Sequence, residues 1–158
     1  MKTIMRSYGT SGNLQIAPVP RDARLHVGGE TLLRLALTAV DEVSTDRLPT
    51  EVVGFPNARM ILTLTAYAYA AGMLDSEELV SNIHDEAQLC YLTAGQVLAE
   101  NDILRFRRRN GPVLLSVLRA VLKSVSAETA AFGLANAPLS AEERLHLAIL
   151  SDSLRMDD

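Results

Sequence analysis

A cluster of cationic and amide side chains between residues 101 and 123 is the part of this sequence best suited to binding a ligand. A guanidinium group presents a planar fork of donors that fits phosphate oxygens and the edge of guanine, and an asparagine amide fits the edge of adenine. Such a cluster indicates a nucleic-acid ligand, because phosphate binding needs a local positive potential. The residues are Arg105, Arg107, Arg108, Arg109, Arg119 and Lys123, with Asn101 and Asn110 as the amides.

The charge of the chain is unevenly distributed. The 158 residues carry a formal net charge of −4 at pH 7, whereas residues 101–123 hold six basic side chains and one acid, for a local charge of +5. Distant acids do not cancel this cluster, because charges act within a Debye length of about 10 Å at 0.1 M salt. In an alternative interpretation the arginines form a solvated face that pairs with the acidic residues Asp75, Glu77, Glu78, Asp85 and Glu86.

Other residues of catalytic type do not form a recognisable site. His84, Asp85 and Glu86 are consecutive, so on a helix they point in different directions and cannot converge on a metal ion. Asp75 and Glu78 have the spacing of a helix cap rather than of an acid-base pair. The chain also contains no nucleophile elbow and no glycine-rich phosphate loop. We therefore expect no enzyme, no cofactor and no metal site.

Helices must position the basic cluster, because apolar residues recur at intervals of three and four along most of the chain and never alternate for long. The predicted fold class is all-α. Ser140 and Glu143 predict a capping box for the last helix. The predicted apolar side of that helix consists of Leu145, Leu147, Ile149, Leu150 and Leu154. The predicted helices cover residues 30–43, 57–71, 75–83, 86–93, 101–110, 112–125 and 140–156.

Glycine and proline mark the limits of these helices. Gly28 and Gly29 precede the first helix, and Gly72 follows the second. Asn110, Gly111 and Pro112 predict a break or kink within the basic segment. Together the signals predict an irregular arm over residues 1–27, followed by one compact multi-helix domain over 28–158 with a helix-turn-helix-like central unit.

The location of the protein follows from its apolar segments. None approaches the roughly 20 residues that cross a bilayer, and the first residues do not resemble a secretory signal. We expect a soluble, cytoplasmic protein without membrane contact. The lone Cys90 lies in the apolar stretch 89–92, which predicts a buried structural thiol.

An ordered series of short segments resembles a known family. The segments are a proline-led apolar helix, a Tyr-Ala-Ala-Gly ending, a Ser-Glu-Glu-Leu start, an acidic-then-apolar helix and an arginine-rich close. They stand at Pro56–Leu62, Tyr69–Gly72, Ser76–Leu79, Asp85–Gly95 and Ile103–Arg109. From about residue 53 to 122 the chain thereby resembles the N-terminal, non-catalytic domain of IS5/IS1182-like insertion-sequence transposases.

The resemblance implies a DNA-associated protein, either a regulator or a truncated transposase product, that binds double-stranded DNA as a homodimer. In that family, metal-binding carboxylates on a separate domain perform catalysis, and no such pattern follows Lys123 here. The family also continues its basic helix without the break at Gly111 and Pro112. The alternative function is a non-enzymatic adaptor or assembly protein, whose acidic surface and last helix, Ser140–Met156, contact a protein partner.

Overall fold

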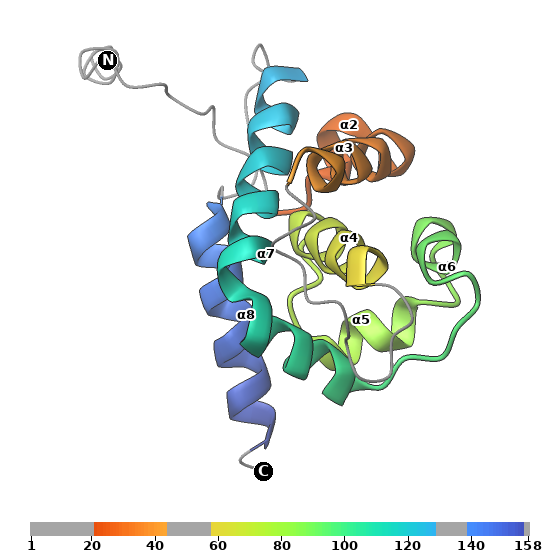
Figure 1. Cartoon of the computed structure of the whole chain (residues 1–158), viewed down its shortest axis with the longest axis vertical. Coiled ribbons are helices and arrows are strands. Elements are labelled where there is room, and N and C mark those ends of the chain that lie inside the picture. The colour runs from red at the N-terminus through yellow and green to blue at the C-terminus, as the bar shows by residue number, and fades with distance from the viewer. Residues whose placement is uncertain (1–20, 44–57, 129–138, 157–158) are drawn as a thin grey trace.

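The computed structural model describes residues 21–43, 58–128 and 139–156, and these ranges contain seven α-helices and no strand. The all-α class is thus confirmed. Most of the predicted arm and the predicted loop at 44–56 lie outside the described residues. Figure 1 shows the long α7 lying beside α8, with the other helices grouped on one side of α7. The helices are α2 (Arg24–Val27), α3 (Gly29–Glu42), α4 (Ala58–Ala70), α5 (Ser76–Asn82), α6 (Ala87–Thr93), α7 (Glu100–Glu128) and α8 (Ala141–Met156).

The centre of the molecule is α4, which packs against α3, α6, α7 and α8. Every side chain from residue 61 to 70 is buried, including both Tyr67 and Tyr69, as a helix that is apolar on all sides requires. The hydroxyl of Thr65 donates to the carbonyl of Ile61 within the helix. The helix ends before Gly72, which has a φ of 84°, and a Cβ added there would lie 2.9 Å from the carbonyl oxygen of Arg21, too close for a side chain.

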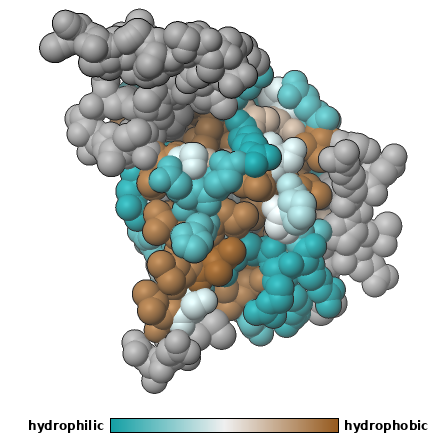
Figure 2. Space-filling model, turned by 90° about the vertical axis from the view of Figure 1, so that its left-hand side faces the viewer, coloured by the Kyte–Doolittle hydropathy of each residue, from teal (hydrophilic) through white to brown (hydrophobic). Residues whose placement is uncertain are grey.

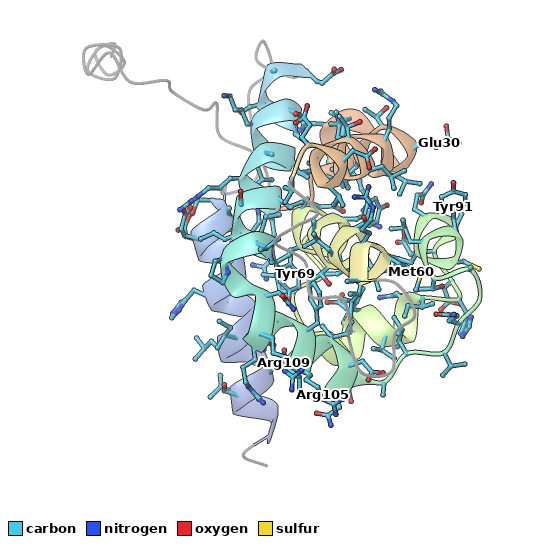
Figure 3. All side chains as sticks on the ribbon, viewed as in Figure 1. Glu30, Met60, Tyr69, Tyr91, Arg105 and Arg109 are labelled. Atoms are coloured by element: carbon cyan, nitrogen blue, oxygen red, sulfur yellow. The ribbon has the colours of Figure 1, made fainter. Side chains whose placement is uncertain are left out.

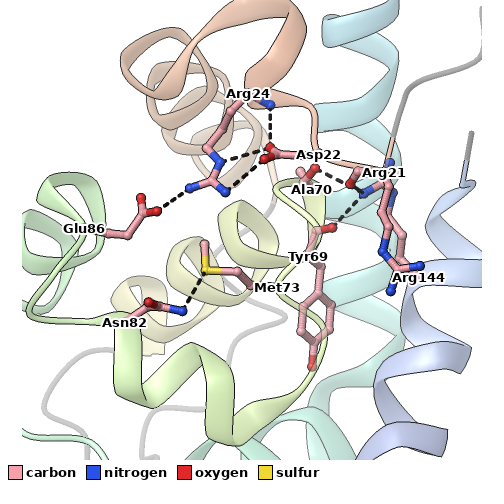
Figure 4. A network of polar contacts seen from close by, with 9 residues as sticks. All are labelled: Arg21, Asp22, Arg24, Tyr69, Ala70, Met73, Asn82, Glu86 and Arg144. Atoms are coloured by element: carbon pink, nitrogen blue, oxygen red, sulfur yellow. Dashed lines mark hydrogen bonds and ion pairs between the residues drawn. The ribbon is translucent and has the colours of Figure 1, made fainter. Parts of the chain in front are cut away.

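The end of the predicted arm is folded, which corrects the prediction of irregular chain up to residue 27. Ala23 is fully buried and its N–H donates to the carbonyl of Ala70, 2.9 Å away. Arg24 forms a two-pronged ion pair with Asp22 and a further ion pair with Glu86, the N-cap residue of α6 (Figure 4). Charged residues therefore hold this segment in place, and the spacing of apolar residues in the sequence does not predict such ion pairs.

The three helices expected to form a helix-turn-helix-like unit are present as α5, α6 and α7. Their packing differs from a compact unit, because α5 packs on α7 whereas α6 packs on α3 and α4. The inner face of α6 carries Leu89, Leu92 and Thr93. Cys90 is exposed, which corrects the prediction of a buried thiol. The basic half of α7 is therefore supported by α5 and α8 rather than by α6.

The predicted break in the basic segment is a kink within one helix. Asn110 has non-helical backbone angles, φ −125° and ψ 26°, and Pro112 lies inside α7. Proline lacks the N–H that continues the helical hydrogen bonds and its ring crowds the preceding turn, which accounts for the kink. The Asn110 amide donates to the carbonyl of Phe106, 3.1 Å away, and stabilises the bend.

The helix caps predicted from the sequence are confirmed at two positions. Asp75 accepts hydrogen bonds from the N–H groups of Glu77 and Glu78 at the start of α5. At the start of α8, the Ser140 hydroxyl accepts from the Glu143 N–H, and the Glu143 carboxylate accepts from the Ser140 N–H. This reciprocal pair is the predicted capping box.

Ser140→Ala is expected to lower the free energy of unfolding by about 1 kcal/mol, because the N-terminal N–H groups of α8 lose their acceptor. Urea denaturation followed by circular dichroism measures this change. The matched control is Ser116→Ala on the exposed side of α7, where alanine favours the helix and no loss is expected. Equal destabilisation by both substitutions would contradict the cap assignment.

The last helix, α8, faces the core with a side that the sequence did not predict. Its buried residues are Ala141, Arg144, Ala148 and Asp152. The leucines and isoleucine of the predicted inner side are half-buried or exposed, and the exposed fractions are 45% for Ile149, 44% for Leu150 and 63% for Leu154. The prediction is therefore wrong for Ile149, Leu150 and Leu154, whereas Leu145 and Leu147 are partly buried and pack against the core.

Candidate nucleic-acid interface

The exposed side of α7 carries a basic stripe, which we define as Asn101, Arg105, Arg108, Arg109, Arg119 and Lys123. Before the kink, Asn101, Arg105, Arg108 and Arg109 follow one another at steps of four, three and one residues, and after it Arg119 and Lys123 are four residues apart. Each group therefore lies on one side of its own part of the helix. Arg108 and Arg109 are exposed and Arg105 is half-buried. Figure 3 shows Arg105 and Arg109 on the basic half of α7, directed away from Tyr69 in the interior.

Three members of the basic stripe are free to bind an external anion. Among the described residues, no carboxylate forms an ion pair with Arg105, Arg108 or Arg109. Glu86, one of the acids that the alternative interpretation pairs with these arginines, is bound to Arg24 instead. No carboxylate in residues 21–43, 58–128 or 139–154 therefore directly neutralises the positive charge at this end of α7.

Arg119 is tied to α8. Its Nε lies 2.6 Å from a carboxylate oxygen of Glu142, and both side chains are more than half exposed. The guanidinium hydrogen bond lowers the pKa of Glu142. An exposed pair of this kind contributes at most about 1 kcal/mol, so a phosphate competes easily for the guanidinium. Lys123 is exposed one turn further along α7.

Arg107 points into the protein, which corrects its prediction as a DNA-contacting residue. Its side chain is 8% exposed, and Nη1 lies 2.7 Å from Oδ2 of Asp152 and 3.1 Å from the hydroxyl of Tyr69. Asp152 also accepts hydrogen bonds from the N–H and the hydroxyl of Ser76, at 3.0 and 2.7 Å. This buried cluster joins α4, α5, α7 and α8.

The charge states in the buried cluster follow from its geometry. Burial raises the pKa of the Tyr69 hydroxyl, and the nearby Arg107 only partly opposes this effect. Burial acts to lower the pKa of Arg107, but the hydroxyl of Tyr69 and the carboxylate of Asp152 outweigh burial, and the net change is upward. At neutral pH the cluster therefore contains a protonated tyrosine beside a charged guanidinium.

The two asparagines of the predicted site have different roles. Asn110 is 7% exposed and bonded to the Phe106 carbonyl, so it cannot reach a base, and its prediction as a DNA contact is corrected. Asn101 is exposed and stays in the basic stripe. It lies in the first turn of α7, which begins at Glu100, and the Asp102 carboxylate accepts the N–H of Ala99 at 3.0 Å.

A groove runs between the basic stripe and α8. It has a volume of about 470 Å³, and its lining includes Leu104, Arg108, Gly111, Ile149 and Ser153. The apolar lining lies directly beside the guanidinium of Arg108.

Comparison of the chain with protein-family models, with curated proteins and with solved structures finds no match. Within residues 21–43, 58–128 and 139–156, no helix is long and apolar enough to cross a bilayer. In the same ranges, no three histidine, cysteine or acidic side chains are grouped so that they would hold a metal ion.

Proposed function

We propose that this protein binds double-stranded DNA through the basic stripe of α7, with Arg105, Arg108 and Arg109 as the principal contacts. The observation that supports this function best is the grouping of three guanidiniums on one exposed helical side without a carboxylate partner among the described residues. The resemblance to the N-terminal domain of insertion-sequence transposases, which closes on these arginines, also favours DNA.

In the proposed mechanism the arginines act mainly on phosphates. Guanidinium forks bind phosphate oxygens with two parallel hydrogen bonds, which position the helix on the duplex. Asn101 lies at the exposed start of α7, where an amide can read a base edge. The chain outside residues 101–123 carries a net charge of −9, so repulsion turns the other faces of the protein away from DNA.

Changing Arg105, Arg108 and Arg109 together to alanine is expected to weaken DNA binding and its salt dependence. Each phosphate contact contributes about 0.9 to the slope of log K against log salt, so the triple variant should have a slope smaller by up to about 2.7. Fluorescence anisotropy of a labelled duplex at several salt concentrations measures this slope.

The control for this experiment is Arg34→Ala, which removes an exposed positive charge from α3. Its slope and affinity should equal those of the unchanged protein at every salt concentration. Binding that does not depend on salt, or a triple variant that binds as tightly as the unchanged protein, would contradict the proposed function.

A further inference from the structure

A second groove lies on the other side of α8, away from the basic stripe. It has a volume of about 320 Å³ and separates α8 from the turn between α4 and α5. Leu147, Leu150 and Leu154 form its α8 wall at intervals of three and four residues. Gly72 and Leu74 contribute the opposite side. Leucines at this spacing form an apolar surface against which another helix can pack.

The apolar wall is open to solvent at two positions one turn apart, where Leu150 and Leu154 remain 44% and 63% exposed. Figure 2 shows a broad hydrophobic area on the left-hand side of Figure 1, the side on which α8 lies. Single exposed apolar residues are ordinary, but a contiguous area of this kind marks an interaction surface.

The charges at the two ends of the groove differ in sign. Arg21 lines the groove, and its backbone lies toward the N-terminal part of α8, since its carbonyl accepts a hydrogen bond from the Arg144 side chain at 2.6 Å. Glu78 lines it near residue 151, because the neighbouring cap residue Asp75 accepts a hydrogen bond from Ser151 at 2.8 Å. Seven helical residues separate these points, a distance of about 10 Å along α8.

We infer that a second copy of this chain occupies the groove, with the two α8 helices antiparallel about a two-fold axis. An antiparallel arrangement reverses the order of charges along the partner, so Arg21 of each copy faces Glu78 of the other. The leucine walls meet between these pairs. One patch thus complements itself, as a two-fold interface requires. A parallel arrangement would place like charges together on this side.

The dimer leaves the basic stripe accessible, because Arg108 lines the groove on the opposite side of α8. Two basic stripes per assembly would double the number of phosphate contacts available to the proposed DNA binding. The dimer itself does not depend on that function, since the leucines, Arg21 and Glu78 are separate from the basic stripe.

Sedimentation velocity over a range of concentrations tests the dimer without DNA. The unchanged protein should sediment as a dimer, and Leu150→Glu should weaken association at least about tenfold, because it places a charge in the centre of the apolar contact. Circular dichroism should show the same helix content in both proteins. Leu25→Glu is the matched control, since Leu25 is 65% exposed on α2, outside the groove, and its change should leave association intact.

A charge exchange tests the antiparallel arrangement. Arg21→Glu and Glu78→Arg should each weaken the dimer, and the protein carrying both changes should regain it, because the opposed charges are then restored in reverse. A monomer at every concentration would overturn the inference. A dimer that tolerates Leu150→Glu would also overturn it, and so would a doubly changed protein weaker than either single variant.

Discussion

Arg107→Ala is expected to lower the free energy of unfolding by about 3–5 kcal/mol, the usual cost of leaving one partner of a buried ion pair alone. Asp152 would keep its hydrogen bonds to Ser76 but lose the cation that lies 2.7 Å from its carboxylate. The Tyr69 hydroxyl would also lose a donor in the interior. Urea denaturation monitored by circular dichroism measures the loss.

The neighbouring exposed arginine is the control for this substitution. Arg108→Ala should change the free energy of unfolding by no more than about 0.5 kcal/mol, as is usual for a surface position. A second check is the double variant Arg107→Ala with Asp152→Ala, whose loss should be smaller than the sum of the single losses because the two side chains interact directly. Additive losses, or similar losses for Arg107 and Arg108, would contradict the buried pair.

Arg144→Ala is expected to have an effect of similar size, about 3 kcal/mol or more, because several backbone acceptors would be left in the interior. Arg144 is 0% exposed, and its side chain donates to four carbonyls that belong to three separate segments. Figure 4 shows Arg144 beside Arg21, Tyr69 and Ala70. Burial lowers its pKa to about 10, so the guanidinium remains charged at neutral pH. The four carbonyls are those of Leu139, Arg21, Tyr69 and Ala70.

Arg144→Lys separates charge from geometry in the same denaturation experiment. Lysine keeps the positive charge but lacks the planar fork that spans acceptors on different segments, so it should recover less than half of the loss. Full recovery by lysine would show that charge alone is needed. A loss below about 1 kcal/mol for Arg144→Ala would contradict the role of this side chain in joining the arm, α4 and α8.

Local signals in the sequence were sufficient for most of the helices and for several of their ends, but not for α2 or for the continuity of α7 across the kink. The capping box at Ser140 and Glu143, the cap at Asp75 and the glycine after α4 each act within a few residues. Such features depend on short-range hydrogen bonds and on backbone angles, which the order of residues specifies directly. The all-α class follows from the same local patterns.

The orientation of α8 was not predictable from its apolar residues. Arg144 and Asp152 occupy the inward side at helical spacing, but their acceptors and donors lie on α4, α5 and α7, far away in the sequence. When the sequence of α8 is considered without those partners, burial of two charged side chains is energetically unfavourable. The side that carries the leucines is then predicted to face the core. Long-range polar pairing therefore overrides the apolar period here.

The candidate site was predicted in part. Arg105, Arg108 and Arg109 lie on the surface, whereas Arg107 does not. A signal for this division was present, because Arg107 falls at helical spacing with Ile103, Phe106 and Leu114 on the apolar side of α7. Its partner Asp152 lies 45 residues later, and no local pattern connects the two.

The central claim is that Arg105, Arg107, Arg108 and Arg109 have two different roles. Arg107 stabilises the fold, and the other three bind DNA. The most direct test measures two quantities, affinity for a labelled duplex and free energy of unfolding, for single alanine variants of Arg105, Arg107, Arg108 and Arg109. The expected result is a split. Arg107→Ala should lose stability, while the other three should lose DNA affinity and remain as stable as the unchanged protein. Absence of salt-dependent DNA binding in the unchanged protein, or a stably folded Arg107 variant with the largest loss of affinity, would contradict the claim.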